Sequence, residues 1–225
     1  MPTRSGRAQA AIMRPSRAEQ RIEVGRAEPS ADLAGLVDYF WWVRWDTPDP
    51  HVQEVVPRPV VHVSAEVVAG APRLLVHGVH PRMFHRRLEG SGHTVACERP
   101  EDGAGVLATW LRRLDPREDP QVATLAELVE RVEEDTSLVR AEQVAELAGA
   151  SLRTLQRRFG SYVGIGPKWV VQRFRLLDVT SAAHGEDEVD WAELAHRLGY
   201  ADQSHLIRAF TQLVGHPPAA YAREA

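Results

Sequence analysis

The stretch VAELAGASLRTLQRRFGSYVGIGPKWV (residues 144–170) has a counterpart in AELAHRLGYADQSHLIRAFTQLVGHPPAAY (residues 192–221), and this pair decides the fold of the C-terminal half. Six residues of the first stretch recur 51 positions later, where Leu155, Arg157, Phe159, Val163, Gly164 and Pro167 return as Leu206, Arg208, Phe210, Val214, Gly215 and Pro218. Upstream of each turn the offset is 50, so the second copy has one extra turn residue. Such self-similarity indicates a duplicated structural unit.

Each copy has the pattern of a helix, a glycine-containing turn and a second helix. In the first copy Gly149 marks the turn, and Ser151 is suited to cap the next helix because its hydroxyl accepts from free backbone N–H groups. In the second copy Asp190 and Asp202 are expected to cap the two helices. Helical periodicity places the apolar residues of each second helix on one inward arc: Leu152, Leu155, Phe159, Tyr162 and Val163, then Leu206, Phe210, Leu213 and Val214.

The charges indicate what the outward faces bind. Residues 151–176 hold six basic side chains and no acidic one, in a chain whose net charge is -4. Such a local patch suits phosphate oxygens, whereas 27 basic against 31 acidic residues exclude a uniformly basic nucleic-acid coat. The second copy sums to -1 over residues 190–221. We therefore expect it to rely more on specific contacts than on phosphate attraction.

An amphipathic helix beginning at Pro167 is expected to connect the two copies. A single rigid helix would fix the spacing between them. Two helices held about 34 Å apart could enter successive major-groove turns on one face of a duplex, so that one polypeptide reads an asymmetric site.

These two stretches closely resemble the DNA-binding domain of AraC-type (AraC/XylS) transcriptional regulators. The resemblance covers roughly residues 119–223 and rests on the GY-x-DQSH-x-x-RAF stretch, the G-x-x-P turns and the duplication. It implies sequence-specific binding to double-stranded promoter DNA. The base contacts that it implies are Arg153, Gln156, Arg157, Gln203, Ser204, His205 and Arg208.

Side-chain chemistry agrees with most of these positions. Arginine can bind guanine O6 and N7 together, and glutamine can bind adenine N6 and N7. The expected phosphate contacts are Arg158, Lys168 and Arg173. For Arg175 the alternative is that it pairs within the domain instead of contacting phosphate.

The front half has a different composition, with short runs of Val, Phe and Trp separated by Pro and Gly. Runs at 39–45, 52–56, 59–68, 74–78 and 93–97 predict antiparallel strands. This region also resembles the N-terminal part of one branch of the same family, which implies a jelly-roll-like sensing and dimerising domain. Here residues 98–105 predict a loop leading directly into a helix at 106–114, so the sheet is shorter than the family's.

The predicted architecture is α+β. It consists of a disordered leader at 1–29, a small antiparallel β domain (a partial, cupin-like jelly roll) at 30–98, a helical linker at 99–118, and an all-α domain at 119–225 with two helix-turn-helix units in seven helices.

Several other functional classes find little support. Cys97 is the single cysteine and can form neither an internal disulfide nor a zinc site that needs several thiolates. The five histidines of the β region, which include no His-x-His pair, are expected at turns and surfaces rather than on a metal: His62, His77, His80, His85 and His93. No catalytic motif indicates an enzyme, and no cofactor is expected.

Three tryptophans, Trp41, Trp42 and Trp45, are expected to be half-buried in a strand. The alternative is a ligand wall or a partner surface, where the helix around Trp110 could dock to form a dimer. No apolar run approaches the roughly 18 residues of a membrane span, and the N-terminus is no secretory signal, so we expect a cytoplasmic protein without a membrane partner.

The sequence favours a transcriptional regulator and leaves two alternatives open: a shortened DNA-binding module without effector control, or a cupin-like metal-dependent enzyme. Besides DNA, the partners to consider are RNA polymerase, a small-molecule effector and a second copy of the chain. The operator sequence, and the choice between activation and repression, stay open.

Overall fold

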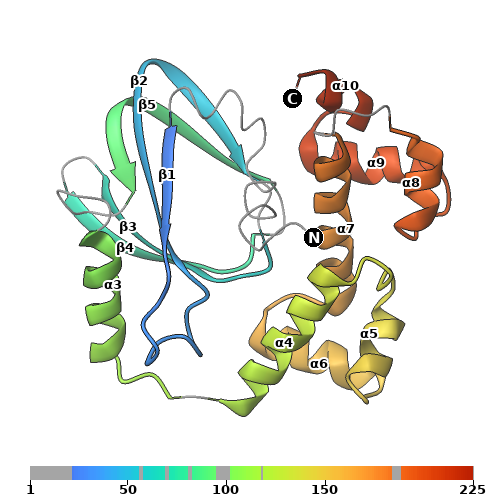
Figure 1. Ribbon diagram of the computed structural model, residues 1–225, viewed down its shortest axis with the longest axis horizontal. Helices are drawn as coiled ribbons and strands as arrows, with labels where there is room; N and C mark the ends of the chain where they lie inside the picture. Colours follow the sequence, from blue (N-terminus) through green and yellow to red (C-terminus); the bar gives the residue numbers. More distant parts are fainter. Residues whose placement is uncertain are drawn as a thin grey trace.

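The computed structural model describes residues 22–55, 58–68, 71–80, 83–94, 102–117, 119–183 and 189–224. Strands come first and helices follow (Figure 1). The strands are β1 (Ile22–Ala27), β2 (Phe40–Val55), β3 (His62–Val68), β4 (Ala71–His77) and β5 (Phe84–Thr94). The helices are α3 (Asp102–Arg113), α4 (Pro120–Glu134), α5 (Ala141–Leu147), α6 (Leu152–Tyr162), α7 (Pro167–Ala183), α8 (Trp191–Arg197), α9 (Gln203–Val214) and α10 (Pro218–Glu224).

The strands form two antiparallel sheets, one with the order β1-β2-β5 and one made of β3 and β4. The α+β class predicted from the sequence, with an N-terminal antiparallel β region followed by helices, is confirmed. Residues 39–45 and 52–56 do not form two separate strands, however. Their residues 40–45 and 52–55 are the two ends of β2, which continues through Pro48 and Pro50 because its pairing with β5 shifts register between Thr47 and His51. An irregularity of this kind accommodates prolines that cannot donate to the ladder.

Two of the tryptophans on β2 lie over glycines of the neighbouring strands. Trp42 pairs with Gly25 of β1 and Trp45 with Gly92 of β5. Each indole occupies the space where a Cβ on the opposite glycine would stand. All three tryptophans are partly buried, as expected for half-buried strand packing.

Two predicted boundaries in the front half need correction. The leader predicted at 1–29 contains β1, which pairs with β2 over its whole length. The loop predicted at 98–105 already contains the start of α3 at Asp102, while Cys97 lies outside the described residues. In both cases pairing or packing against a distant segment sets the local structure, and neither segment signals it by its own periodicity.

Helix α3 packs against the β region of its own chain. Leu107 and Ala108 of α3 form a small core with Leu33 and Phe40. The residue before Leu33 is tied to the same helix, because Arg112 donates to both carboxylate oxygens of Asp32 at 2.6 and 3.1 Å. The helix around Trp110 therefore packs within the protomer.

Seven helices, α4 to α10, follow in the described part of residues 119–225, as the sequence predicts. They share one continuous hydrophobic core. Helix α7 lies at its centre and is buried on most of its circumference, with α4, α5 and α6 around one end and α8 and α9 near the other (Figure 1). Among the described residues, no helix is both long and apolar enough to cross a membrane.

The β region and the helical half are in contact. Arg58, which precedes β3, forms an ion pair with Glu133 of α4, and each of the two side chains is only 16% exposed. Met83, just before β5, packs against the core of the helical half.

Candidate nucleic-acid interface

The first helix-turn-helix unit consists of α5, a turn at Gly149 and α6. Helix α6 begins where the sequence predicts, because the Thr154 backbone N–H donates to the Ser151 hydroxyl at 3.2 Å. Leu155 and Phe159 are 1% and 0% exposed and anchor the inner face of the helix. The three base-contact candidates on α6 are all exposed: Arg153, Gln156 and Arg157.

One residue of the predicted inner arc lies elsewhere. Tyr162 is 45% exposed. Its hydroxyl donates to a carboxylate oxygen of Asp119 at 3.1 Å, and Asp119 caps the N-terminus of α4. Tyr162 is in the last turn of α6, so its polar end reaches a neighbouring helix terminus instead of the core.

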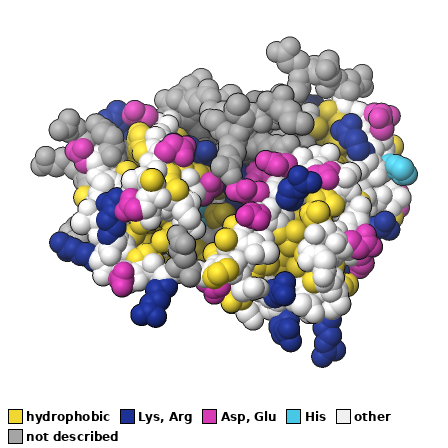
Figure 2. Space-filling model, turned by 60° about the horizontal axis from the view of Figure 1, so that its bottom comes forward, with side chains coloured by type: hydrophobic (Ala, Val, Ile, Leu, Met, Phe, Trp, Pro, Cys, Tyr) yellow, Lys and Arg dark blue, Asp and Glu magenta, His cyan; other side chains and the backbone are white. Residues whose placement is uncertain are grey.

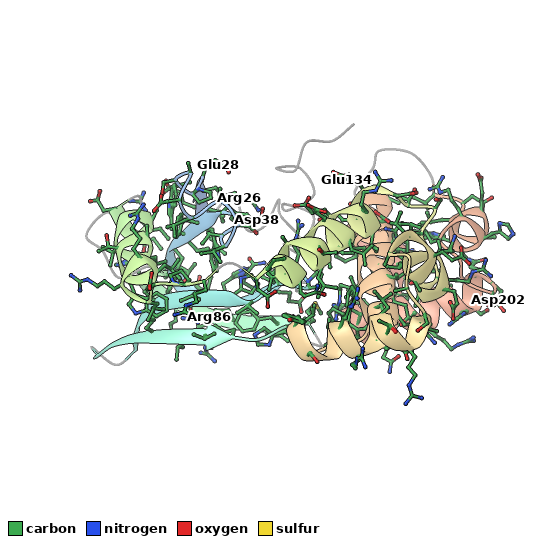
Figure 3. The ribbon with its side chains drawn as sticks, turned by 90° about the horizontal axis from the view of Figure 1, so that it is seen from below. Arg26, Glu28, Asp38, Arg86, Glu134 and Asp202 are labelled. Carbon is green, nitrogen blue, oxygen red and sulfur yellow. The ribbon has the colours of Figure 1, made fainter. Side chains whose placement is uncertain are left out.

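The second unit, α8, a turn at Gly199 and α9, repeats this design. Asp202 caps α9 by accepting the His205 backbone N–H at 2.7 Å, and Asp190 caps α8 in the same way. Leu206 and Phe210 are both 0% exposed. The four candidates on this helix are exposed: Gln203, Ser204, His205 and Arg208. Figure 3 shows Asp202 at the end of the helical half that is remote from the sheets.

The basic patch predicted over residues 151–176 is smaller than its composition indicates. Lys168 is exposed and Arg158 is partly exposed, which fits contact with phosphates. Arg173 is 3% exposed and lies over the ring of Trp169, with 4.4 Å between the guanidinium carbon and the ring centroid. Burial lowers the pKa of Arg173 to about 10.

This burial argues against the assignment of Arg173 as a phosphate contact. It lies on α7, whose sides are covered by both helix-turn-helix units, and a covered side chain does not reach a duplex. Counting charges along the sequence does not show which side of a central helix is covered.

Arg175 pairs within the domain, as the alternative expectation had it. It is 1% exposed and donates to the backbone carbonyl oxygens of Val132 and Asp135, where α4 ends. Its Nε also lies 3.4 Å from a carboxylate oxygen of Asp178. Arg175 thus ties α7 to the end of α4 and stabilises the arrangement of the first unit.

Basic and acidic side chains are not mixed evenly over the surface of the helical half. Figure 2 shows Lys and Arg side chains projecting along the lower edge of this half, while Asp and Glu side chains gather nearer the middle of the view. A local basic edge on an acidic chain is the distribution expected for a protein that approaches a polyanion in one orientation.

A pocket of about 230 Å³ lies in the β region, between α3 and strands β2 and β3. Its walls are mostly apolar and aromatic, and include Phe40, Trp41, Leu107 and Trp110, with His62 as a polar group. Burial lowers the pKa of the His62 imidazole, and the nearby His80, His77 and Arg58 lower it further. His62 is therefore mainly neutral at pH 7.

The histidines do not assemble a metal site in the described part of the chain, where no group of three or more His, Cys, Asp or Glu side chains could hold a metal ion. His77 shares a hydrogen bond of 3.0 Å with the Ser64 hydroxyl, and its ring lies 5.8 Å from that of His80. The Nδ1 atom of His85 lies 3.7 Å from a carboxylate oxygen of Glu54. The imidazoles of His62, His77 and His80 thus lie near one another beside the pocket. The spacing of these histidines in the sequence does not indicate this cluster.

Three features of the molecule were not predicted from the sequence. They are the pocket beside α3, the ion pair between Arg58 and Glu133, and the packing of Tyr200 on His205, whose ring centroids are 5.4 Å apart. The extra turn residue of the second copy is the single signal that points to the last of these.

Two family models match the chain. Residues 144–224 match a helix-turn-helix domain, and residues 25–108 match a domain of unknown function. The second match runs from β1 to α3, so it covers the segment that forms the β region together with its packed helix.

Two relatives are named as AraC-like transcription regulators. One, from Streptomyces lividans, is 32% identical over 118 residues, which cover 52% of this chain and 37% of the relative. The other, from Streptomyces antibioticus, is 32% identical over 126 residues, covering 55% of this chain and 39% of the relative. The chain thus spans less than two fifths of the length of these relatives.

Among solved structures, the C-terminal domain of AraT, a response regulator from Geobacillus stearothermophilus, aligns with a TM-score of 0.42 at 23% identity. The alignment covers 49% of this chain and 89% of that one.

Proposed function

We propose that this protein binds promoter DNA sequence-specifically, because residues 144–224 match a helix-turn-helix domain and the chain is similar to relatives named as AraC-like transcription regulators. Helix α6 and helix α9 would lie in successive major grooves of one duplex. The choice of activator or repressor depends on where the operator lies relative to a promoter, and contact with RNA polymerase stays a prediction.

The observation that carries this proposal is the matching presentation of the two helices. Each buries a leucine and a phenylalanine at equivalent positions, Leu155 and Phe159 in α6, Leu206 and Phe210 in α9. All seven base-contact candidates are consequently exposed on the outer faces. An exposed outer face with arginine and glutamine at its centre fits direct readout of guanine and adenine in a major groove.

The phosphate contacts of the proposal are Arg158 and Lys168, without Arg173. Arg158 is on α6 and Lys168 is at the start of α7, so we expect the first unit and the helix that follows it to supply more of the salt-dependent affinity. Helix α9 has Arg208 as its one outward arginine and would contribute through base contacts.

The test is selection of bound sequences from a random DNA pool, followed by mapping of protected bases. We expect a preferred sequence with two protected segments about one helical turn, roughly 10 base pairs, apart. A double variant, R153A/R157A, should lose the preference for the first segment. The matched control R113A/R117A removes the same charge from exposed positions outside the two helix-turn-helix units. This control should keep the preference for the first segment. A single protected segment, or no preferred sequence, would contradict the proposal.

A second proposed function is effector binding in the β region, supported by the pocket beside α3. A dry cavity of about 150 Å³ accommodates benzene, so a pocket of about 230 Å³ suits a small bicyclic or substituted aromatic molecule. Trp41 and Trp110 would stack on it and His62 would supply one hydrogen bond. Arg58 links this region to Glu133 of α4, which offers a route by which occupancy could affect the DNA-binding half.

Thermal-shift measurements with indole, 2-naphthol and benzoate test the pocket directly. Stabilisation by one of them should disappear in W110A and persist in V106A, since Val106 lies on the same helix and is 57% exposed, outside the pocket lining. Operator affinity measured with and without that compound then decides whether binding regulates the protein. Absence of stabilisation by all three compounds would favour the DNA-binding module without effector control.

Two further expectations belong here. We place the protein in the cytoplasm, because the partner proposed is chromosomal DNA. Homodimer formation is tested by sedimentation of the free protein and of its complex with a single operator duplex, where two units in one chain predict one protomer per site.

A further inference from the structure

His205 differs from the other base-contact candidates because its ring is held by two neighbours. It lies in the first turn of α9 and is exposed. The backbone N–H of Ala201 donates to its Nδ1 at 3.4 Å. The ring of Tyr200 meets it edge to face, with 5.4 Å between centroids and an interplanar angle of 86°. These contacts orient the imidazole before any partner binds.

The hydrogen bond from Ala201 also decides which ring nitrogen carries the proton. A backbone N–H can only donate, so Nδ1 of His205 must accept and carries no proton in this arrangement. In the neutral imidazole the proton then resides on Nε2. The group that His205 offers to a partner is therefore an N–H donor.

Tyr200 is held by packing rather than by its hydroxyl. It is 8% exposed, and within the described residues its buried hydroxyl has no hydrogen-bond partner. Its backbone N–H donates to the Ala195 carbonyl at 2.9 Å, which closes the turn between α8 and α9. The aromatic ring, and not the phenol group, is thus the part that supports His205.

The first unit has no equivalent of this pair. The position matching His205 is Thr154, whose hydroxyl bonds with that of Ser151 at 2.9 Å and so faces the helix cap. Between the turn glycine and the cap the first copy has Ala150 alone, whereas the second has Tyr200 and Ala201. The one-residue insertion that distinguishes the copies therefore falls among the two residues that hold the imidazole.

From this geometry we infer that Tyr200 is a positioning residue for His205, and that His205 reads a major-groove acceptor through its Nε2–H. The acceptors available there are purine N7, guanine O6 and thymine O4. The inference rests on the proposed function. It explains how the second unit, which has a net charge of -1, can recognise bases with little help from phosphate attraction.

The experiment compares discrimination at each base pair of the selected operator for the wild type, H205A, Y200L and Y200F. H205A should lower discrimination at one base pair by about ten-fold, as expected for loss of one good base contact. Y200L should lower it at that same base pair, while Y200F, which keeps the ring, should leave it unchanged. In the double variant H205A/Y200L, the leucine should cause no further loss. Thermal unfolding of each variant shows that it is folded.

Two further measurements address the donor itself. Nitrogen-15 NMR of the free wild-type protein should show His205, identified by its absence in H205A, with the proton on Nε2. An operator that lacks the contacted acceptor, through a 7-deaza purine for N7, 2-aminopurine for guanine O6, or a thymine analogue without O4, should bind the wild type as weakly as the natural operator binds H205A.

The inference is overturned if the proton resides on Nδ1, or if Y200L reduces discrimination equally with and without His205. A wild-type protein that shows no sequence preference would instead refute the proposed function.

Discussion

Gly199 lies directly against Val139, and a Cβ placed on Gly199 would stand 2.5 Å from the Cβ of Val139. Gly199 is the turn glycine of the second helix-turn-helix unit, and Val139 precedes α5 of the first. The second unit therefore touches the segment that leads into the first unit. A direct contact of this kind limits how far the outer faces of α6 and α9 can shift relative to one another.

The turn glycines of the two units offer a matched pair of substitutions. Gly149 and Gly199 both adopt positive φ angles, 57° and 78°, but space is open around Gly149. We expect G149A to lower the free energy of unfolding by about 1 kcal/mol, the cost of a left-handed alanine. G199A should cost roughly 2 to 4 kcal/mol, since it adds the collision with Val139. Urea unfolding of both variants measures the difference. Equal costs would show that Val139 moves aside without a measurable loss of stability.

Arg157 is expected to carry sequence preference because it projects from the centre of the exposed face of α6. R157A should lower affinity for the selected operator by about ten-fold to one hundred-fold and change the preferred base at one position. R157K keeps the charge without the bidentate geometry, so it should recover non-specific binding but not the base preference. Competition binding with operator and random DNA measures both. Unchanged specificity in R157A would remove α6 from the proposed interface.

Lys168 and Arg173 are separated by five positions on the same helix and should behave in opposite ways. K168A should weaken binding equally for all DNA sequences and reduce the slope of log affinity against log salt by about 0.9. R173A removes a buried side chain and should lower stability while leaving that slope unchanged. Salt titrations of binding, together with thermal unfolding, distinguish the two. A reduced slope in R173A would mean that Arg173 becomes exposed when DNA binds.

Arg175 is expected to be a determinant of stability. R175M leaves two carbonyl oxygens at the end of α4 without this donor and leaves Asp178 without this cation, so we expect a loss of about 3 kcal/mol. The double variant R175M/D178L removes both charges and should recover part of the loss. Denaturant unfolding measures both variants. A single variant as stable as the wild type would show that the bonds to α4 contribute no net stability.

The pair of Asp32 and Arg112 predicts a pH-dependent contribution from the β region. Hydrogen bonds from Arg112 and Ser30 hold the pKa of Asp32 well below the usual value of an aspartate, 3.8. Because the folded-state pKa is depressed, the stabilisation is fully present above roughly pH 4 and is lost progressively as the pH falls below that value. R112Q should therefore have a lower unfolding temperature than the wild type at pH 6, and the difference should shrink toward pH 3. A constant difference would assign the effect to packing of the Arg112 stem.

Much of the helical half follows from local patterns. The caps at Ser151, Asp190 and Asp202 and the buried pair Phe159 and Phe210 are predicted correctly, because capping and helical periodicity depend on residues within a few positions of one another. The resemblance to AraC-type regulators is confirmed by the helix-turn-helix match and by the relatives of that name. The roles of the individual base-contact residues stay predictions.

The β region is less predictable for a physical reason. The pairing of β1 with β2, and the continuity of β2 through Pro48 and Pro50, depend on hydrogen bonds to strands far away in the chain. Strand preference reflects such neighbours more than intrinsic propensity. The short apolar runs therefore locate the strands approximately but show neither their length nor their partners.

The order of residues alone was enough to establish a duplicated helix-turn-helix unit, its capped helices and an outer face that includes Arg153, Arg157 and Arg208, since helices are built from near neighbours. Which arginines of α7 are covered, that Gly199 meets Val139, and that Tyr200 orients His205 became known only with the assembled fold. These features are contacts between separate elements, or depend on how one element is buried among others, and helical periodicity has no information about what lies beyond its own helix.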